Sequence, residues 1–381
     1  MDRSGVPPAR PEVEGLQAYS APLEGRRGLL RLDFNENTIG PSPKVVEAIR
    51  AIPADHYAIY PEYDGLREDV IAALVPPGMP AGGGLTPGHI GVFNGVDAAI
   101  HAVFQAYGSG GDRLLTTSPT FGYYAPCARM QGMTIEAVPH RLPGFAFPQE
   151  AIAAALAPDA SGVVPRLLLL CNPNNPTGTR LQAADVLALA AGAPRTLVVV
   201  DELYEAFTGD SVLPLLLAEA AAGGGDPFAR HPNLLVLRSL SKTAGIAGLR
   251  IGFAIGAAPL VDRVSRVTGP YDVNSFAVTA ARAALADQLY IDAYVAEVLS
   301  ARDWLVARLQ AAGVEHHVAG GNYLLLWPWR PVAEVERELR AAGILVRSMA
   351  GKPQIDGSLR VSLGIHQQME RFWEAYRLID A

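Results

Sequence analysis

Cysteine is nearly absent from this chain, which carries Cys127 and Cys171 and no others among its 381 residues. Two cysteines are too few for a disulfide framework or a zinc cluster of thiolates. The sequence also lacks any apolar run that approaches the ~18 residues that a membrane-spanning helix needs. Residues 1–15 are rich in proline and charge and have no apolar core of the signal-peptide kind. We therefore expect a soluble, cytoplasmic protein with no metal site and no membrane partner.

Runs of positive charge are missing as well. Lys and Arg total 31 against 38 for Asp and Glu, so the formal net charge is −7. An acidic chain without a basic run is a poor candidate for binding nucleic acid or an anionic membrane surface. The partners that remain are small molecules and other protein chains.

Apolar residues, in contrast, are abundant. They make up 50% of the chain and charged residues 18%, which predicts a sizeable core and excludes global disorder. Uniformly apolar runs alternate with helical segments, as in a mostly parallel sheet covered on both faces by helices. These strands are expected at 90–93, 113–117, 134–138, 166–171, 196–200 and 234–237. A long Ala-rich helical region at 277–312 and further strands at 323–327 and 357–363 predict a second, α+β domain.

The most informative stretch is 239–252, which follows the apolar run at 234–237. Lys242 lies there among glycines at 245, 248 and 252, which let backbone or a ligand approach closely. Ser239, Ser241 and Arg250 supply two hydroxyls and a fixed cation, a set that suits a phosphate. A lysine in this setting is placed to form an imine with an aldehyde. A phosphate and an aldehyde on one small molecule describe pyridoxal 5'-phosphate (PLP).

Other polar residues follow other predicted strands, where ligands of open α/β sheets bind. Helix N-terminal amides after Asn94-Gly95 could hold a phosphate. Asp201 could keep the pyridine nitrogen protonated, and Asn175 with Tyr204 could donate to the 3'-oxygen. Tyr124, preferred over Phe121, could cover one face of the ring. Lys242 would be both the covalent anchor and the general base.

Taken singly, these residues have ordinary structural explanations. Asp201 could cap a helix, Asn175 could shape a turn, and Tyr124 could be a core residue. Lys242 and Arg250 could be ordinary charges. Their occurrence together, each after a strand, favours the cofactor site.

The sequence resembles the fold-type I PLP enzymes of the class I/II aminotransferase group, and most of all the histidinol-phosphate aminotransferase family. The matching segments spread over essentially the whole chain: Asn35-Glu36-Asn37, Tyr60-Pro61-Glu62, Pro119 to Tyr124, Asn174 to Gly178, Asp201 to Tyr204, and 239–252. The resemblance implies a seven-stranded, mostly parallel sheet in a large domain (45–272). It also implies an N-terminal arm with part of the small domain (1–44), and a C-terminal small domain (273–381).

The resemblance also implies roles for individual residues. Phosphate ligands would be Ser239, Ser241, Arg250, Gly95 and the amides of Val96 and Asp97. The tyrosine matching Tyr60 reaches the phosphate of the neighbouring subunit in that family, which implies an obligate homodimer. Arg360 would clamp a carboxylate bidentately, and Arg347 would add a second anionic contact. The other implied substrate contacts are Tyr19, Asn37 and Asn322.

We therefore predict a homodimeric PLP-dependent aminotransferase that acts on histidinol phosphate and 2-oxoglutarate. An aromatic amino acid is the alternative amino donor, because the same arginines suit a phosphate or a carboxylate. A threonine-phosphate decarboxylase-like enzyme and a non-enzymatic PLP-binding domain are further alternatives. Thr38, Phe34, Phe121 and the Gly-rich loop around 223 depart from the family pattern. None of these departures touches the predicted cofactor ligands.

Overall fold

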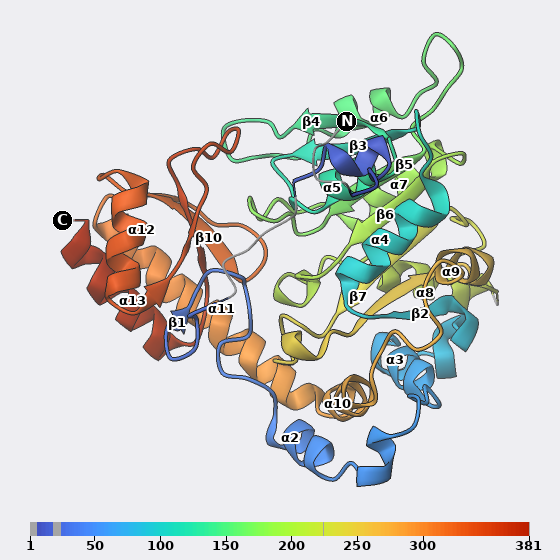
Figure 1. The fold of residues 1–381 in the computed structure, drawn as a ribbon, viewed down its shortest axis with the longest axis horizontal. Coiled ribbons are helices and arrows are strands. Elements are labelled where there is room, and N and C mark those ends of the chain that lie inside the picture. Colours follow the sequence, from blue (N-terminus) through green and yellow to red (C-terminus); the bar gives the residue numbers. More distant parts are fainter. Residues whose placement is uncertain (1–5, 18–23, 224, 381) are drawn as a thin grey trace.

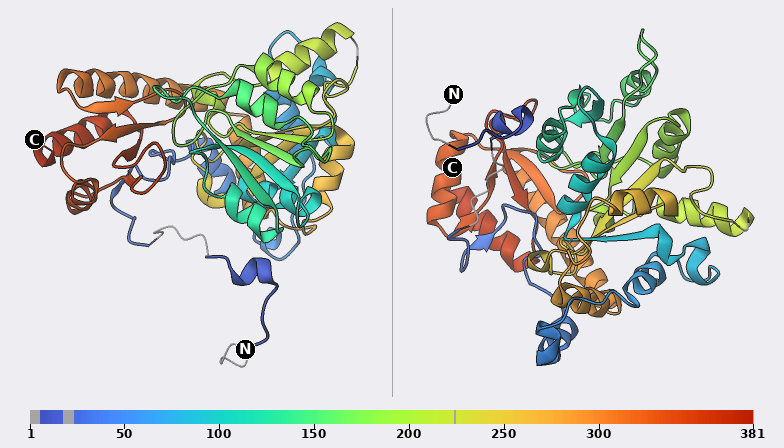
Figure 2. Two further views of the ribbon diagram at one scale, coloured as in Figure 1. Left: turned by 90° about the horizontal axis from the view of Figure 1, so that it is seen from above. Right: turned by 45° about the vertical axis from the view of Figure 1, so that its right-hand side comes forward.

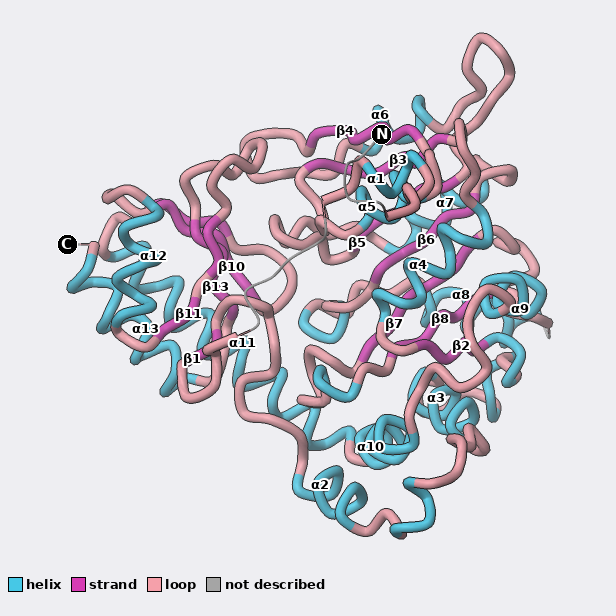
Figure 3. Tube along the Cα trace, in the orientation of Figure 1, coloured by secondary structure: helices cyan, strands magenta, loops and turns pink. Residues whose placement is uncertain are grey.

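The computed structural model describes residues 6–17, 24–223 and 225–380 of the chain. Two large hydrophobic clusters organise these residues, one around each of two sheets. Figure 1 shows the two sheets side by side, and Figure 2 shows from two further sides that the smaller unit lies beside the larger one. Figure 3 separates strands from helices in the same view as Figure 1.

The larger sheet confirms the predicted α/β fold. Its seven strands lie in the order β2-β8-β7-β6-β5-β3-β4, and β8 alone runs antiparallel to its neighbours. Every residue of β5 and β6 is buried, as expected where helices cover both faces. The strands are β2 (Ile90–Phe93), β3 (Arg113–Ser118), β4 (Thr134–Pro139), β5 (Leu167–Cys171), β6 (Leu197–Asp201), β7 (Leu234–Ser239) and β8 (Gly252–Gly256).

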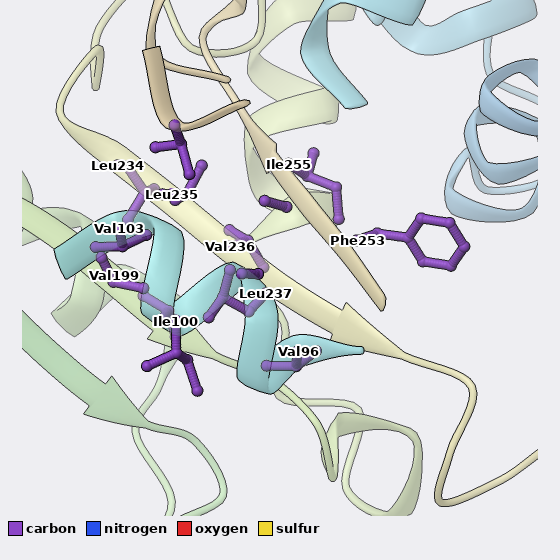
Figure 4. Close-up of a cluster of buried hydrophobic side chains, with 14 of the residues drawn as sticks. Val96, Ile100, Val103, Val199, Leu234, Leu235, Val236, Leu237, Phe253 and Ile255 are labelled. Carbon is purple, nitrogen blue, oxygen red and sulfur yellow. The ribbon is translucent and has the colours of Figure 1, made fainter. Parts of the chain in front are cut away.

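Helices cover this sheet on both sides. The helices of this unit are α2 (Pro43–Arg50), α3 (Leu66–Leu74), α4 (Val96–Tyr107), α5 (Tyr124–Met130), α6 (Gln149–Ala155), α7 (Ala183–Gly192), α8 (Leu213–Gly223), α9 (Ala258–Ser265) and α10 (Ser275–Leu285). Among them, α2 packs against α10, and α10 also packs against α3. Short 3₁₀ turns lie at Ala54–Tyr57, Ala81–Gly84, Pro87–His89, Glu205–Phe207 and Ala247–Leu249. Figure 4 shows Val96, Ile100 and Val103 of α4 packed on β7 and β8. This packing carries the N-terminus of α4 to the edge of the sheet where β7 ends.

The smaller unit has an antiparallel sheet in the order β12-β13-β10-β9. These strands are β9 (Glu315–His317), β10 (Tyr323–Trp327), β12 (Arg347–Ser348) and β13 (Leu359–Ser362), and the helices are α11 (Gln288–Ala311), α12 (Val332–Ala341) and α13 (His366–Ile379). A parallel pair, β1 (Leu30–Arg31) with β11 (Ile344–Leu345), ties the N-terminal segment to this unit. The short helix α1 (Pro11–Glu14) precedes it.

Several elements differ from the sequence-based expectation. The helix expected over 120–131 begins at Tyr124, because Thr120 is held in a loop by a hydrogen bond from its Oγ1 to Asn174 Oδ1 (2.7 Å). The helical region expected over 277–312 is two helices, α10 and α11, which meet at Ala286-Asp287. Strand β8 and helices α8, α9 and α13 were not predicted.

Helix α11 links the two units. Its first turn, through Ile291, packs with the larger hydrophobic cluster, and the helix packs with the smaller cluster from Tyr294 onward. Helix α10 also packs with the larger cluster. The hydrophobic contacts of the large unit thus continue past residue 272, and the predicted domain boundaries stay predictions.

Within the described ranges, the helices are too short or too polar to cross a bilayer. The same residues contain no group of three or more His, Cys, Asp or Glu side chains that could hold a metal ion.

Candidate active site

Polar residues from several strands meet at one edge of the larger sheet. Strands β5, β6 and β7 are mutually parallel, so their carboxyl ends lie at the same edge. Asn175 follows β5, Asp201 ends β6, and Lys242 follows β7. Residues of the smaller unit, including Asn35 and Arg360, complete the cluster through hydrogen bonds to the larger one. The sequence-predicted centre is therefore assembled at the junction of the two units.

Lys242 lies inside this junction. Its Nζ donates a hydrogen bond to the carbonyl of Phe34 (3.0 Å) and lies 5.9 Å from the centre of the Tyr204 ring. Burial lowers the pKa of Lys242 to about 8, and the nearby charge of Arg360 acts in the same direction. A lysine with a lowered pKa is a neutral nucleophile for a larger part of the time near pH 7.

Asp201 is a buried carboxylate, 2% exposed. Its Oδ2 accepts a hydrogen bond from the hydroxyl of Tyr124 (2.7 Å), and its Oδ1 accepts one from Leu203 N (3.3 Å). Burial raises the pKa of Asp201 to about 6, although both hydrogen bonds oppose that shift. A cationic ligand atom placed beside this carboxylate would lower its pKa and be held by it.

The contact with Asp201 corrects the role predicted for Tyr124. Its side chain is 1% exposed and its hydroxyl is committed to Asp201, so its ring does not offer an open face to a ligand. Phe121, the residue passed over for that role, is half-buried and meets the Tyr124 ring edge-on at 5.5 Å and 82°. The spacing of two aromatic residues three apart did not reveal which one turns inward.

The hydroxyl oxygen of Tyr204 accepts hydrogen bonds from two side-chain amides. Asn175 Nδ2 donates to it at 3.2 Å and Asn35 Nδ2 at 3.0 Å. Asn175 and Tyr204 were predicted as a pair, whereas Asn35 was not predicted as a site residue. Its only sequence signal was its place in the segment Asn35-Glu36-Asn37.

A cradle of backbone and hydroxyl groups lies beside Lys242. Gly95, whose φ is +80°, directly precedes helix α4, and no described side chain caps the first amides of the helix. Gly252 approaches this turn so closely that an added Cβ would lie 2.6 Å from Val96 N. The Ser239 hydroxyl donates to Ser241 Oγ (2.8 Å). These groups are of the kind that can hold an anion at a helix N-terminus.

Arg250 adds a cation to the cradle. Its backbone is in the left-handed region at φ +60°, a strained conformation for a residue with a side chain. Its Nη2 pairs with Asp97 Oδ2 at 3.0 Å. Of the glycines predicted to allow close approach, Gly252 faces Val96, and Gly245 is covered by the backbone of Gly40, while Gly248 has open space beside it.

The two predicted substrate arginines face each other. Arg347 of β12 and Arg360 of β13 are cross-strand partners, which places their Cβ atoms about 5 Å apart. Arg360 donates to Asn175 Oδ1 (2.8 Å) and to the carbonyl of Asp33, and Arg347 lies 5.9 Å above the Phe34 ring. Like charges directly opposite destabilise a strand pair, so this arrangement favours an anionic ligand.

Two other predicted substrate contacts act instead within the protein. Asn37 is 5% exposed; its Nδ2 donates to the Thr243 carbonyl and its Oδ1 accepts from Ile39 N and Gly40 N. Asn322 is fully buried, and its Nδ2 donates to the Asn35 carbonyl (3.2 Å). Asn37 therefore supports the loop of residues 33–40 rather than facing a substrate, which corrects that prediction. Asn322 supports the same loop through Nδ2, but its Oδ1 has no partner among the described residues, so its substrate contact stays a prediction.

The remaining two predictions lie away from this centre. Tyr60 is 71% exposed and stacks on Tyr271 with ring centres 4.1 Å apart. Tyr19 lies outside the described residues.

A model of the family described as aminotransferase class I and II matches residues 27–375. The chain belongs to this family. It is 35% identical to histidinol-phosphate aminotransferase 2 of Caulobacter vibrioides, over 96% of this chain and 93% of that protein. Among solved structures, a putative histidinol-phosphate aminotransferase from Erwinia carotovora atroseptica is 26% identical with a TM-score of 0.79, covering 95% of this chain and 98% of that one. The Sinorhizobium meliloti histidinol-phosphate aminotransferase in complex with pyridoxal-5'-phosphate has the same fold, with 23% identity, a TM-score of 0.82, and coverage of 99% and 98%.

The family implies PLP as the cofactor, and the residues of this chain fit that molecule. The cradle between Gly252 and the start of α4 leaves room for no side chain, but its amides and hydroxyls suit a phosphate. The buried Asp201 lacks a cationic partner among the ion pairs of the described residues, which a protonated pyridine nitrogen would supply. Lys242 is the amine available to the aldehyde.

Proposed function

We propose that this aminotransferase transfers the amino group of histidinol phosphate to 2-oxoglutarate. The observation that carries the proposal is the pair of arginines, Arg347 and Arg360, that face each other across β12 and β13. Histidinol phosphate presents a phosphate dianion, and 2-oxoglutarate presents two carboxylates. One pair of guanidinium groups can serve both in turn, because guanidinium matches phosphate and carboxylate geometry equally well. The curated relative from Caulobacter vibrioides, which bears that name, supports the choice of substrate.

Each site residue has a distinct task in this proposal. Bound PLP supplies an electron-accepting ring that stabilises negative charge at the substrate Cα. Lys242 would anchor the cofactor, and its Nζ, once free, would take the proton from the substrate Cα and deliver it to the C4' carbon of the cofactor, on the other side of the amine nitrogen. The pKa of about 8 lets Nζ act as a base near neutral pH. Asp201 holds the ring nitrogen's proton, and Asn175 and Tyr204 donate hydrogen bonds to the 3'-oxygen.

The binding residues complete the site. Ser239, Ser241, Arg250 and the amides of Val96 and Asp97 bind the cofactor phosphate. We place Phe121, rather than Tyr124, against the ring face, since Phe121 keeps an accessible surface. Tyr124 instead holds Asp201 in position through its hydroxyl. Arg360 clamps the carboxylate nearer the reacting carbon of the dicarboxylate, and Arg347 binds either its second carboxylate or the phosphate of histidinol phosphate.

A homodimer with shared sites is part of the proposal, and so is a location in the cytoplasm. Tyr60, with its hydroxyl on the surface, would reach the cofactor phosphate of the partner subunit. The stacking of Tyr60 on Tyr271 at an exposed surface supports this role, because exposed aromatic clusters are typical of interaction sites.

The proposal is tested by mixing purified enzyme separately with histidinol phosphate, phenylalanine and glutamate. We expect the absorbance of the lysine-bound cofactor near ~420 nm to fall rapidly with histidinol phosphate and with glutamate. The Lys242→Ala variant is the control and should show no such band. A rapid loss with phenylalanine and none with histidinol phosphate would reassign the enzyme to aromatic amino acids. Release of CO2 from threonine phosphate would instead indicate a decarboxylase.

A further inference from the structure

We propose that Asn35 is a positioning residue that directs the single hydroxyl proton of Tyr204 toward the 3'-oxygen of the cofactor. The inference rests on the proposed role of Tyr204 as a donor to that oxygen. It assigns a task to a residue of the N-terminal segment that the proposed function does not use.

The first observation is that two amide groups share one phenol oxygen. Asn35 Nδ2 lies 3.0 Å from Tyr204 Oη, and Asn175 Nδ2 lies 3.2 Å from it. A tyrosine hydroxyl has one proton to donate and two lone pairs that accept. When two N–H groups donate to the oxygen, both lone pairs are occupied. The hydroxyl proton must then point away from both asparagines.

The second observation settles which end of each amide faces Tyr204. Ser362 Oγ donates to Asn35 Oδ1 (2.8 Å) and accepts from Asn35 N (2.8 Å). Arg360 Nη1 donates to Asn175 Oδ1 (2.8 Å). A guanidinium group can only donate, so the Asn175 carbonyl oxygen must face Arg360. Both carbonyl oxygens are thereby taken, and both Nδ2 groups are left for Tyr204.

The third observation is that the backbone of Asn35 is built for this placement. Its φ is +55°, in the left-handed region that asparagine tolerates better than most residues. The side chain is 1% exposed, and Asn322 Nδ2 holds the Asn35 carbonyl at 3.2 Å. A strained residue persists where its surroundings hold it, often at a functional site. Here the left-handed backbone of Asn35 places its side-chain amide against Tyr204.

The arrangement also connects substrate binding with the cofactor. Arg360 and Ser362 are two residues apart on β13, so they share one face of the strand. One orients Asn175 and the other orients Asn35. The strand that carries the carboxylate-binding arginine therefore also sets the two amides that orient Tyr204.

The test measures the pH at which the absorbance of the bound cofactor changes, a readout independent of turnover. A donor to the negatively charged 3'-oxygen favours the deprotonated lysine–cofactor linkage, so losing the donor raises this midpoint. We expect Tyr204→Phe to raise it by about one pH unit, the size of a hydrogen bond to a charged group. Asn35→Gly, which keeps the positive φ, should raise it by about half as much.

Two further variants separate positioning from general damage. In the double variant Asn35→Gly/Tyr204→Phe the midpoint should equal that of Tyr204→Phe alone, because coupled residues are not additive. Ser362→Ala, which frees the Asn35 amide to rotate, should shift the midpoint in the same direction and serves if Asn35→Gly does not fold. The control is Asn233→Ala. Asn233 Nδ2 donates to the carbonyls of Ala190, Ala193 and Thr196 at the opposite edge of the sheet, so this change should lower stability without moving the midpoint.

The outcomes are distinguishable. If Tyr204→Phe leaves the midpoint unchanged, the proposed role of Tyr204 is wrong, and this inference falls with it. If Tyr204→Phe raises the midpoint but Asn35→Gly and Ser362→Ala do not, Asn35 has no positioning role, and the proposed function stands. Additive shifts in the double variant would also overturn the inference.

Discussion

The charged form of Asp201 lowers the stability of the folded protein. Burial raises its pKa to about 6 from an ordinary value of 3.8, so the charged form is disfavoured by burial. The folded chain therefore binds this proton more tightly than the unfolded chain does. Between pH 4 and pH 6 the unfolded chain loses the proton first, and stability falls as pH rises. Above pH 6 the full difference persists as a penalty.

We expect Asp201→Asn to stabilise the cofactor-free protein at pH 7 by about 3 kcal/mol, the free-energy equivalent of that pKa difference. The gain should vanish near pH 4, where the native carboxyl is protonated. Urea unfolding of both proteins across pH 4–7 measures it, and the raised pKa of the neighbouring Glu202 cancels in the comparison. The same variant should lose most of its transaminase activity, because the ring nitrogen loses its partner.

Tyr124→Phe is the matched control for the titration of Asp201. Removing the hydroxyl removes a hydrogen bond that lowers the Asp201 pKa, so the pH range over which stability falls should extend upward. A range that moved downward would show that Asp201 is not the titrating group.

At the scale of elements, β12 and β13 place two arginines in direct register. Such a pair stores like-charge repulsion in the ligand-free sheet. Binding an anion between the two arginines relieves this repulsion. The pair therefore lowers the stability of the ligand-free sheet and raises its affinity for an anion.

Arg347→Gln should therefore stabilise the ligand-free protein by about 0.5 kcal/mol while raising the KM for histidinol phosphate. Arg360→Lys keeps the charge but loses the bidentate geometry. It should lower kcat/KM for glutamate by about 10- to 100-fold. Steady-state kinetics on both substrates, together with urea unfolding, checks this division. An unchanged rate with glutamate would remove Arg360 from the site.

At the scale of the whole molecule, an aromatic surface remains uncovered in the single chain. Tyr57, Ile59, Tyr60 and Tyr271 are each more than half exposed, and His56, Tyr60 and Arg282 line a cavity of about 230 Å³ nearby. Exposed apolar groups of this kind are typical of protein interfaces. The proposed dimer would cover them.

Subunit mixing tests that dimer. Tyr60→Ala and Lys242→Ala chains should each show low activity alone, because one lacks the phosphate contact and the other lacks the anchor. A mixed dimer would contain one site with a native Lys242 and the native Tyr60 of the other subunit. Each mixed dimer should therefore have about half the activity of a native dimer, so an equal mixture recovers about a quarter, with light scattering confirming the dimeric mass. No recovery from mixed dimers would place Tyr60 outside the partner's site.

Much of this centre could be predicted from the sequence because parallel strands impose a simple rule. Each apolar run predicts a buried strand, and the polar residue after it lies at the edge of the sheet where ligands bind. Lys242, Asp201, Asn175 and the start of α4 follow directly. The rule fails for side chains that reach the centre from loops. Asn37 and Asn35 are two residues apart in one loop, and their sequence does not tell which one turns to Tyr204.

The sequence by itself determined the family, the order of most strands of the larger sheet and the polar residues that follow them. These depend on local patterns, since hydrophobic periodicity and chain connectivity place a strand end without reference to distant residues. Tertiary structure alone decided that Tyr124 serves Asp201, that Asn35 joins Tyr204, and that Arg347 faces Arg360. Each of these contacts joins segments that folding brings together from across the chain. Which hydrogen bond forms there depends on side-chain direction and burial, and both are set only when the two units pack against each other.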